Sequence, residues 1–365
     1  MTSSDTSAAP LFDGHNDVLS KLARAGGRAA LEGFARGREG GIDLPKARAG
    51  GMMGGLFAVW VPSDGAVAAD YEAMMERPPY DVPLAERVPQ PHALGAAMAQ
   101  VALLLEMDRR GDVALCRSLA QIEAARAAGR LAAVLHVEGA EAIGPDLDVL
   151  DVLHAAGLRS LGPVWSRPTI FGHGVPFRFP SDAEIGDGLT PEGEALVRRC
   201  DALGIMIDMA HLNAAGFRDV MRVSSKPLVV THSNAHAVTP HSRNLTDWQL
   251  DAIAETGGMV GVNFATSFLR ADGRKDAATP LADVLRHLDH LIERLGEDHV
   301  GFGSDYDGAQ VPQEVADVGR FQALRDSMSR HGYDAGLIAK LCHANWLGAL
   351  GRAWHDDHNS PGRAE

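Results

Sequence analysis

The sequence lacks paired cysteines, a recognisable secretion signal and any apolar run long enough to cross a bilayer. Its 3 cysteines, Cys116, Cys200 and Cys342, are widely spaced and odd in number, which argues against a disulfide framework and indicates buried thiols in a reducing compartment. The first residues, MTSSDTSAAPLFDGHNDVL, contain neither a basic nor an apolar segment, so no signal peptide is expected. We therefore expect a soluble, cytoplasmic protein.

An excess of positive charge is also absent. The chain of 365 residues has 34 Lys and Arg against 48 Asp and Glu, which gives a net charge of −14 with His neutral. Because such a surface repels phosphate backbones and anionic lipid, we expect neither nucleic acid nor a membrane as a partner. The 40 glycines show no fixed period, which excludes a collagen-like chain. A hydrophobic content of 45% and a charged content of 22% are typical of a globular protein.

Short apolar runs alternate with longer helical patterns, as in a parallel sheet built from βα units. Eight runs predict strands, at 11–19, 53–61, 131–138, 158–165, 205–210, 227–231, 259–264 and 299–303. Helices are predicted at 94–109, 119–128, 248–255 and 281–295, and another begins after Thr190 with Pro191 and Glu192. Eight such units favour an α/β fold, a single (β/α)8 TIM-type barrel over residues 1–365 with peripheral N- and C-terminal extensions. The competing fold is an open doubly wound sheet, although no GxGxxG follows the first strand.

Side chains that could bind metal follow five of these strands at their C-terminal ends. They are His15 and Asp17, Glu138, His211, His232 and Asp305. Since the carboxyl ends of barrel strands carry the active site, these six residues are expected to meet in one cavity. Each residue alone is more often an ordinary turn or hydrogen-bonded residue. Together, however, imidazoles and carboxylates are costly to bury without a partner, and a metal ion is the natural one.

The kind of ligand indicates the kind of metal. Imidazole and carboxylate without thiolate suit Zn²⁺, with Mn²⁺ or Co²⁺ as substitutes. The set exceeds the needs of one tetrahedral ion, so two zinc ions per chain about 3.5–4 Å apart, bridged by a carboxylate and a hydroxide, fit better. Glu138 lies on a strand between the two groups of ligands and is the expected bridge.

Seven short motifs follow one another over nearly the whole chain. They are DGHNDV at 13–18, VEG at 137–139, LTPEGEALVRRCDALGIMIDMAHL at 189–212, THSNA at 231–235, RN at 243–244, GSDYDG at 303–308 and HANWL at 343–347. In this combination and order the sequence resembles the membrane (renal) dipeptidase family, zinc peptidases of the metal-dependent hydrolase superfamily.

The resemblance implies a (β/α)8 barrel with a binuclear zinc site and a catalytic role for its ligands. His15 and Asp17 would hold one zinc ion and His211 and His232 the other, with Glu138 between them. Arg243, otherwise interpreted as a solvated surface charge, would bind the terminal carboxylate of the substrate. Asp305 would bind the substrate amine or transfer a proton. The expected reaction is hydrolysis of small dipeptides, including those with a C-terminal D-residue.

Departures from the family leave the substrate open. Relatives carry a histidine after the fourth strand, where this chain has Trp165, so Trp165 is a candidate substrate contact. His173 in the following loop is a second candidate, and it fits an ordinary loop residue equally well. The alternative function is the same metal site acting on a lactone or another amide, and a third is a non-catalytic metal- or ligand-binding barrel. The loop 166–188 would serve as a lid or as a contact in a homodimer.

Overall fold

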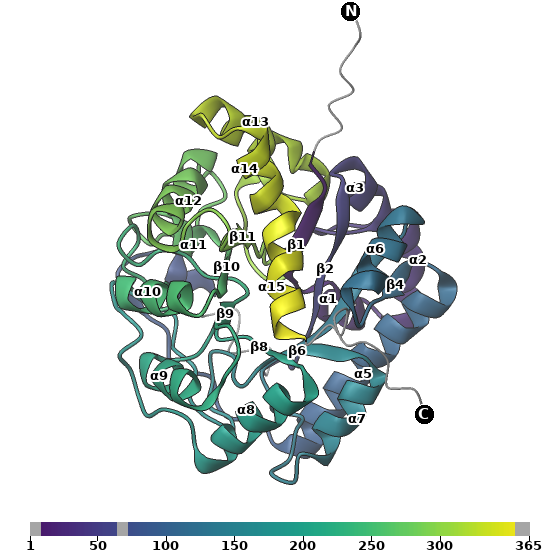
Figure 1. Cartoon of the computed structure of the whole chain (residues 1–365), viewed down its shortest axis with the longest axis vertical. Helices are drawn as coiled ribbons and strands as arrows, with labels where there is room; N and C mark the ends of the chain where they lie inside the picture. Colours follow the sequence, from purple (N-terminus) through teal and green to yellow (C-terminus); the bar gives the residue numbers. More distant parts are fainter. Residues whose placement is uncertain (1–8, 64–71, 355–365) are drawn as a thin grey trace, which may run out of the picture.

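Two parallel sheets form the centre of the computed structural model, which describes residues 9–63 and 72–354. The first sheet has the order β1 (Leu11–Asn16), β2 (Met52–Trp60), β5 (Leu131–Glu138), β6 (Leu158–Gly162) and β8 (Met206–Ile207), and β4 (Val113–Leu115) pairs with β5. The second contains β9 (Val229–Val230), β10 (Met259–Val262) and β11 (Val300–Phe302) in the order β11-β10-β9. Isolated parallel bridges, Asp208 with Val229 and Asn16 with Tyr306, lie between the two sheets. The result is an α/β fold with a curled parallel sheet (Figure 1).

Helices surround these strands in Figure 1. Those that follow the early strands are α1 (Val18–Arg24), α2 (Leu31–Arg36), α3 (Leu44–Ala49), α5 (Gln90–Arg110), α6 (Leu119–Ala127) and α7 (Asp148–Ala156). The later ones are α8 (Pro191–Leu203), α9 (Ala214–Val223), α10 (Asp247–Glu255), α11 (Thr266–Leu269), α12 (Leu281–Leu295), α13 (Gln322–His331), α14 (Ala335–Ala339) and α15 (Asn345–Ala353). In the described part of the chain, no helix combines the length and the apolar character that crossing a membrane requires.

The strand cores are buried on both faces, which explains their continuous apolar sequences. Every residue of β5 is buried, and β2 is buried up to its last residue, Trp60. Gly54 lets these two strands pair closely, because a Cβ atom there would lie 2.5 Å from the carbonyl oxygen of Ala132. On α12, Leu281, Val284 and Leu288 are buried on the side that faces the sheet, as the helical spacing predicts.

The predicted elements are present, and several strands are shorter than expected. The bounds of β5 and α12 agree with the prediction, and Thr190 caps α8 through a hydrogen bond from the Gly193 amide at 3.1 Å. The strand predicted at 205–210 ends after Ile207, since the Asp208 carboxylate there accepts hydrogen bonds from neighbouring backbone amides. The strand predicted at 11–19 ends at Asn16, and α1 begins at Val18.

Some elements were not predicted. A small antiparallel pair joins β3 (Tyr80–Asp81) to β7 (Arg178–Phe179), which lies inside the predicted loop 166–188. The segment between α1 and β2 forms α2 and α3 and buries Leu31 and Phe34. The 3 cysteines are free and buried, as expected. The prediction that there is no signal peptide concerns the first residues, of which 1–8 lie outside the described range. Residues 355–365 of the C-terminal extension also lie outside it.

Candidate metal centre and active site

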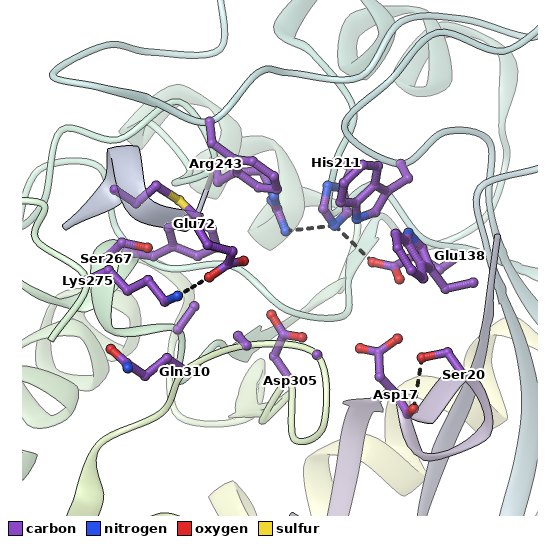
Figure 2. A pocket seen from close by; sticks show the side chains of 18 of the residues that line it. Asp17, Ser20, Glu72, Glu138, His211, Arg243, Ser267, Lys275, Asp305 and Gln310 are labelled. Carbon is purple, nitrogen blue, oxygen red and sulfur yellow. Dashed lines mark hydrogen bonds and ion pairs between the residues drawn. The ribbon is translucent and has the colours of Figure 1, made fainter. Parts of the chain in front are cut away.

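A cavity of about 380 Å³ lies where the strands end at their carboxyl side. Asp17 enters it after β1, Glu138 at the end of β5, His211 after β8 and Asp305 after β11. Figure 2 shows Arg243, His211 and Glu138 in a row along one side of this cavity, with Asp305 and Asp17 across from them. The carboxyl ends of parallel strands therefore bring together residues that are far apart in the sequence.

Glu138 is the centre of the cluster. Its Oε1 atom lies 2.9 Å from His211 Nε2, 3.4 Å from His232 Nε2 and 3.7 Å from His15 Nε2. His15 Nε2 in turn lies 3.4 Å from Asp17 Oδ2. None of these five side chains belongs to a residue more than 5% exposed. The structure thus brings together the five residues that the resemblance implies as metal ligands.

The hydrogen bonds around His232 determine which of its nitrogens faces the cluster. The single hydroxyl proton of Thr231 is donated to Asp208 Oδ2 at 2.7 Å, so Thr231 Oγ1 accepts from His232 Nδ1 at 2.8 Å. The lone pair of His232 then lies on Nε2 and points toward Glu138. This is the tautomer that a metal-binding imidazole adopts, with its other nitrogen held by a fixed partner.

His211 is arranged in the same way. Its Nδ1 atom lies 2.8 Å from Ser166 Oγ, and its Nε2 atom lies 3.3 Å from Nη2 of Arg243, which can only donate. The lone pair of His211 is therefore placed on Nε2, only 3.1 Å from His232 Nε2. Two lone pairs and a carboxylate at such distances repel one another unless a cation lies among them. Both ring nitrogens of His15 are also buried without a hydrogen-bond partner among the described residues.

Three groups of potential ligand atoms fit an ion by distance among the described residues; one joins His15 to His136 and Asp208, and the other two consist of expected ligands only. In His15, Glu138 and His232, and again in His15, Asp17 and Asp305, the ligand atoms lie within 4.8 Å of one another. The donor set is imidazole and carboxylate, which suits zinc and related divalent ions. The residues present therefore fit a metal centre, and the two overlapping groups leave room for more than one ion.

The electrostatics of the cluster agree with this interpretation. Burial raises the pKa of Glu138 well above its usual range, and the nearby Asp17 and Asp305 add to the rise. Burial and the repulsion of Asp17 raise the pKa of Asp305 to about 6. For His15, burial favours the neutral ring, but Glu138 and Asp17 outweigh it and raise its pKa to about 10. Burial lowers the pKa of His211 well below its usual value. Protons compensate these buried carboxylates when no metal ion is bound, and the neutral ring of His211 is available to bind a cation in their place.

Arg243 is not a surface charge, so the interpretation of this residue as a solvated cation is wrong. It is 2% exposed and lines the cavity beside His211. Its guanidinium donates to the carbonyl oxygens of Ala210 and His232 and to Ser233 Oγ, the last at 3.1 Å. Burial lowers its pKa to about 10, and the nearby Asp305 carboxylate partly offsets this effect. The guanidinium therefore stays charged at neutral pH within the cavity wall.

Asp305 is held in a strained backbone position at the opposite wall. Its φ angle is 60°, a region that L-residues seldom adopt and that is often found at functional sites. Its Oδ2 atom accepts a hydrogen bond from Asn263 Nδ2 at 3.0 Å. Asn263 was not predicted from the sequence as a partner of Asp305. Its position directly after β10 is the same strand-end signal that identified the ligands.

Trp165 lines the cavity, and His173 is not among the lining residues that the structure describes. The Trp165 ring centre lies 5.8 Å from that of His211 and 5.3 Å from that of Trp60. The carbonyl oxygen of His173 accepts from the Asn213 amide at 3.4 Å. The two expected substrate contacts are therefore separated by the structure, and an aromatic wall takes the place of a histidine.

Several polar residues that support the cluster or line the cavity were not predicted from the sequence. Ser166 contacts His211 directly, and Asp208 supports His232 through Thr231; neither was predicted as a site residue, although Asp208 lies within the motif at 189–212. Glu72 and Lys275 form an ion pair at another part of the cavity wall (Figure 2). A single sequence does not identify buried partners such as Asp208 and Ser166, although Asp208 lies three residues before His211 at the same strand end.

Comparison with known proteins agrees with this site. The family model for membrane dipeptidases, peptidase family M19, matches residues 6–360. A metallo peptidase from Rhodobacter sphaeroides, solved with a phosphinate mimic of the dipeptide L-Ala-D-Ala, is 54% identical, with a TM-score of 0.93 over 95% of this chain and 100% of that one. A second solved protein, a dipeptidase of the same peptidase family, is 54% identical, with a TM-score of 0.92 over 95% of this chain and 99% of that one. An uncharacterized protein in the pqqA 5′ region of Klebsiella pneumoniae is 45% identical over 257 residues, which is 70% of this chain and 95% of the relative.

Proposed function

The chain belongs to the membrane dipeptidase family of metallo-dipeptidases, and on that premise we propose that it is a binuclear zinc dipeptidase. The observation that carries the proposal is the position of Glu138 Oε1, which faces the Nε2 atoms of three buried histidines. His15 and Asp17 would hold one ion, His211 and His232 the other, and Glu138 would contribute to both. When bound, zinc supplies an acidified water and polarises a scissile carbonyl.

The residues across the cavity would bind the ends of a short substrate. Four of the five guanidinium N–H groups of Arg243 are donated to protein atoms, and the remaining Nε–H, buried without a partner among the described residues, would donate to a substrate carboxylate. Asp305 has its Oδ2 atom occupied by Asn263, which leaves Oδ1 to bind the substrate amine or to pass a proton to the leaving nitrogen. The volume of about 380 Å³ suits a small ligand and disfavours a long peptide.

Dipeptides with a C-terminal D-residue belong to the proposed substrates. The relative from Rhodobacter sphaeroides, 54% identical, was solved with a mimic of L-Ala-D-Ala. Trp165 in the cavity wall favours testing a second substrate class, lactones and amides other than dipeptides. Its indole offers an apolar face where a histidine would donate or accept a proton. Lactones and N-acyl amino acids therefore belong in the substrate panel.

The proposed architecture is a single closed (β/α)8 barrel. The parallel bridges between Asp208 and Val229 and between Asn16 and Tyr306 support closure of the two sheets into one ring of eight strands. Hydrogen bonds from the Ser304 backbone and side chain to Asp13, both at 2.8 Å, also support it. A closed ring would fix all the ligands on one rim.

The test combines metal analysis with a substrate panel. We expect about two zinc ions per chain, loss of L-Ala-D-Ala and L-Ala-L-Ala cleavage with a chelator, and recovery with Zn²⁺. Glu138→Gln should abolish cleavage, whereas Glu184→Gln, in an exposed ion pair with Arg218, should leave it unchanged. Undiminished cleavage after complete removal of metal would refute the proposal. Turnover of lactones without turnover of any dipeptide would replace it with the alternative substrate class.

A further inference from the structure

A buried cation lies behind the aromatic wall of the cavity. Arg167 is 0% exposed, and its Cζ atom lies 5.2 Å from the ring centre of Trp165 and 5.8 Å from that of Trp60. Both indoles line the cavity, and their rings meet at an interplanar angle of 68°. At such distances a guanidinium is attracted to the ring faces, most strongly where water is excluded.

The polar contacts of Arg167 fix it in place. Its Nε atom donates to Glu141 Oε1 at 2.6 Å, Nη1 donates to Ser63 Oγ at 3.0 Å, and Nη2 donates to the carbonyl oxygen of Val61. Val61 and Ser63 follow β2, Glu141 follows β5, and Arg167 itself follows β6. One side chain therefore ties together the loops that leave three neighbouring strands.

This connection matters because the loop after β6 carries residues of the site. Trp165 immediately precedes Ser166, whose Oγ atom lies 2.8 Å from Nδ1 of His211. Arg167 follows at the next position, and its own amide donates to the carbonyl oxygen of Trp165 at 2.7 Å. The position of the Trp165 ring thus depends on a residue that does not itself line the cavity.

A stabilising role alone is a poor explanation for this pair. Burying an arginine and a glutamate costs several kcal/mol per ion in desolvation, and an apolar pair of equal volume is often as stable or more so. The geometry of a planar group with three separate acceptors and two flanking rings is instead suited to holding those rings in one orientation.

We propose that Arg167, held by Glu141, is a positioning residue that fixes Trp165 and Trp60 as the wall against which the substrate packs, and so sets substrate affinity. For its kinetic test, this proposal rests on the proposed dipeptidase function. It predicts that disturbing Arg167 changes KM much more than kcat, because Ser166 keeps its own contact with His211 and Asp305 keeps its contact with Asn263.

The kinetic test uses Arg167→Lys, which keeps the charge but loses the planar fork. We expect KM for dipeptides to rise about tenfold, with kcat and zinc content changed less than about twofold. In a background with both Trp60→Ala and Trp165→Ala the same substitution should change KM by less than about twofold, because its effect passes through the two missing rings. Arg199→Lys is the matched control, since Arg199 also pairs with a carboxylate, Asp151, but does so on the exposed surface.

A second readout does not need activity. The near-ultraviolet circular dichroism difference between wild type and Trp165→Phe reports the fixed environment of that indole. We expect this difference to disappear when it is measured in the Arg167→Lys background and to persist in the Arg199→Lys background. If wild type cleaves no dipeptide, the proposed function fails while this measurement still decides the role of Arg167.

Two results would overturn the inference. One is an unchanged KM together with an unchanged difference spectrum in Arg167→Lys. The other is a parallel fall of kcat, zinc content and unfolding temperature, which would make the pair purely structural. If Arg167→Lys does not fold, Glu141→Gln decides, because its amide oxygen still accepts from Arg167 Nε. It should then raise KM in the same direction by a smaller factor, and an unchanged KM would refute the proposal.

Discussion

Removing the Thr231 hydroxyl should weaken metal binding without touching a metal ligand. Thr231 Oγ1 lies 2.7 Å from Asp208 Oδ2 and 2.8 Å from His232 Nδ1, so it connects a buried carboxylate to an expected zinc ligand. Thr231→Val keeps the shape of the side chain and removes this connection. His232 then loses the acceptor that fixes its tautomer and its ring orientation.

The magnitude follows from the contacts that remain. Partners of metal-binding histidines are typically worth roughly 10–100-fold in metal affinity, or about 1.4–2.7 kcal/mol. Asp208 keeps two backbone amides on Oδ1, from Ala210 at 3.0 Å and from Thr231 at 2.8 Å. Asp208 Oδ2 loses its donor and His232 Nδ1 loses its acceptor, so the loss in unfolding free energy should be near the upper end of the usual range of about 1–3 kcal/mol.

The assay is competition for zinc against a chelator of known affinity, with unfolding followed in parallel. Thr239→Val is the matched control, because Thr239 is also 0% exposed and lies 3.4 Å from a histidine nitrogen, that of His287, outside the cavity. The control should lose stability and keep its zinc affinity. If Thr231→Val binds zinc as tightly as wild type, or loses no more affinity than Thr239→Val, the argument from the tautomer of His232 is wrong.

Two further predictions concern stability. Gly14→Ala should lower the unfolding free energy by about 1–3 kcal/mol, because a Cβ atom there would lie 2.1 Å from the buried ring of Trp346; urea unfolding measures this, and an unchanged midpoint would contradict it. His287 has its pKa lowered by burial to about 3, so the unfolded chain binds more protons than the folded one between about pH 3 and pH 6.5. Its contribution should therefore make stability fall by about 1.4 kcal/mol per pH unit as the pH drops through this window. His287→Asn should flatten that slope in urea titrations at several pH values, and an identical slope would show that another group controls it.

The metal ligands could be predicted from the sequence because they lie at the ends of predicted strands. The prediction needed only the order of strands and the rule that parallel strands place their carboxyl ends on one side. His15, Glu138 and His211 lie at the ends of three different strands. Glu138 Oε1 lies 3.7 Å from His15 Nε2 and 2.9 Å from His211 Nε2. Their spacing in the sequence carries no such information without the fold.

The features that were not predicted depend on contacts between segments far apart in the chain, and a single sequence does not show which segments come together. Asn263 holds Asp305 from a strand end whose sequence shows only an ordinary polar residue. Arg167 is indistinguishable in the sequence from an exposed arginine, yet it is fully buried between loops 104 and 26 residues away. The short strands β3 and β7 pair across nearly a hundred residues and have no periodicity to reveal them.

The motif DGHND shows why short sequences around the ligands are so restricted. His15 and Asp17 face the metal cluster, and the residues between and before them have separate structural tasks. Asp13 accepts two hydrogen bonds from Ser304, next to Asp305, and so joins β1 to the loop after β11. Asn16 donates to the carbonyl oxygen of Leu56 in β2 at 3.0 Å. Each position thus joins the cluster to a neighbouring strand, and a substitution at a residue that binds no metal should still displace the ligands beside it.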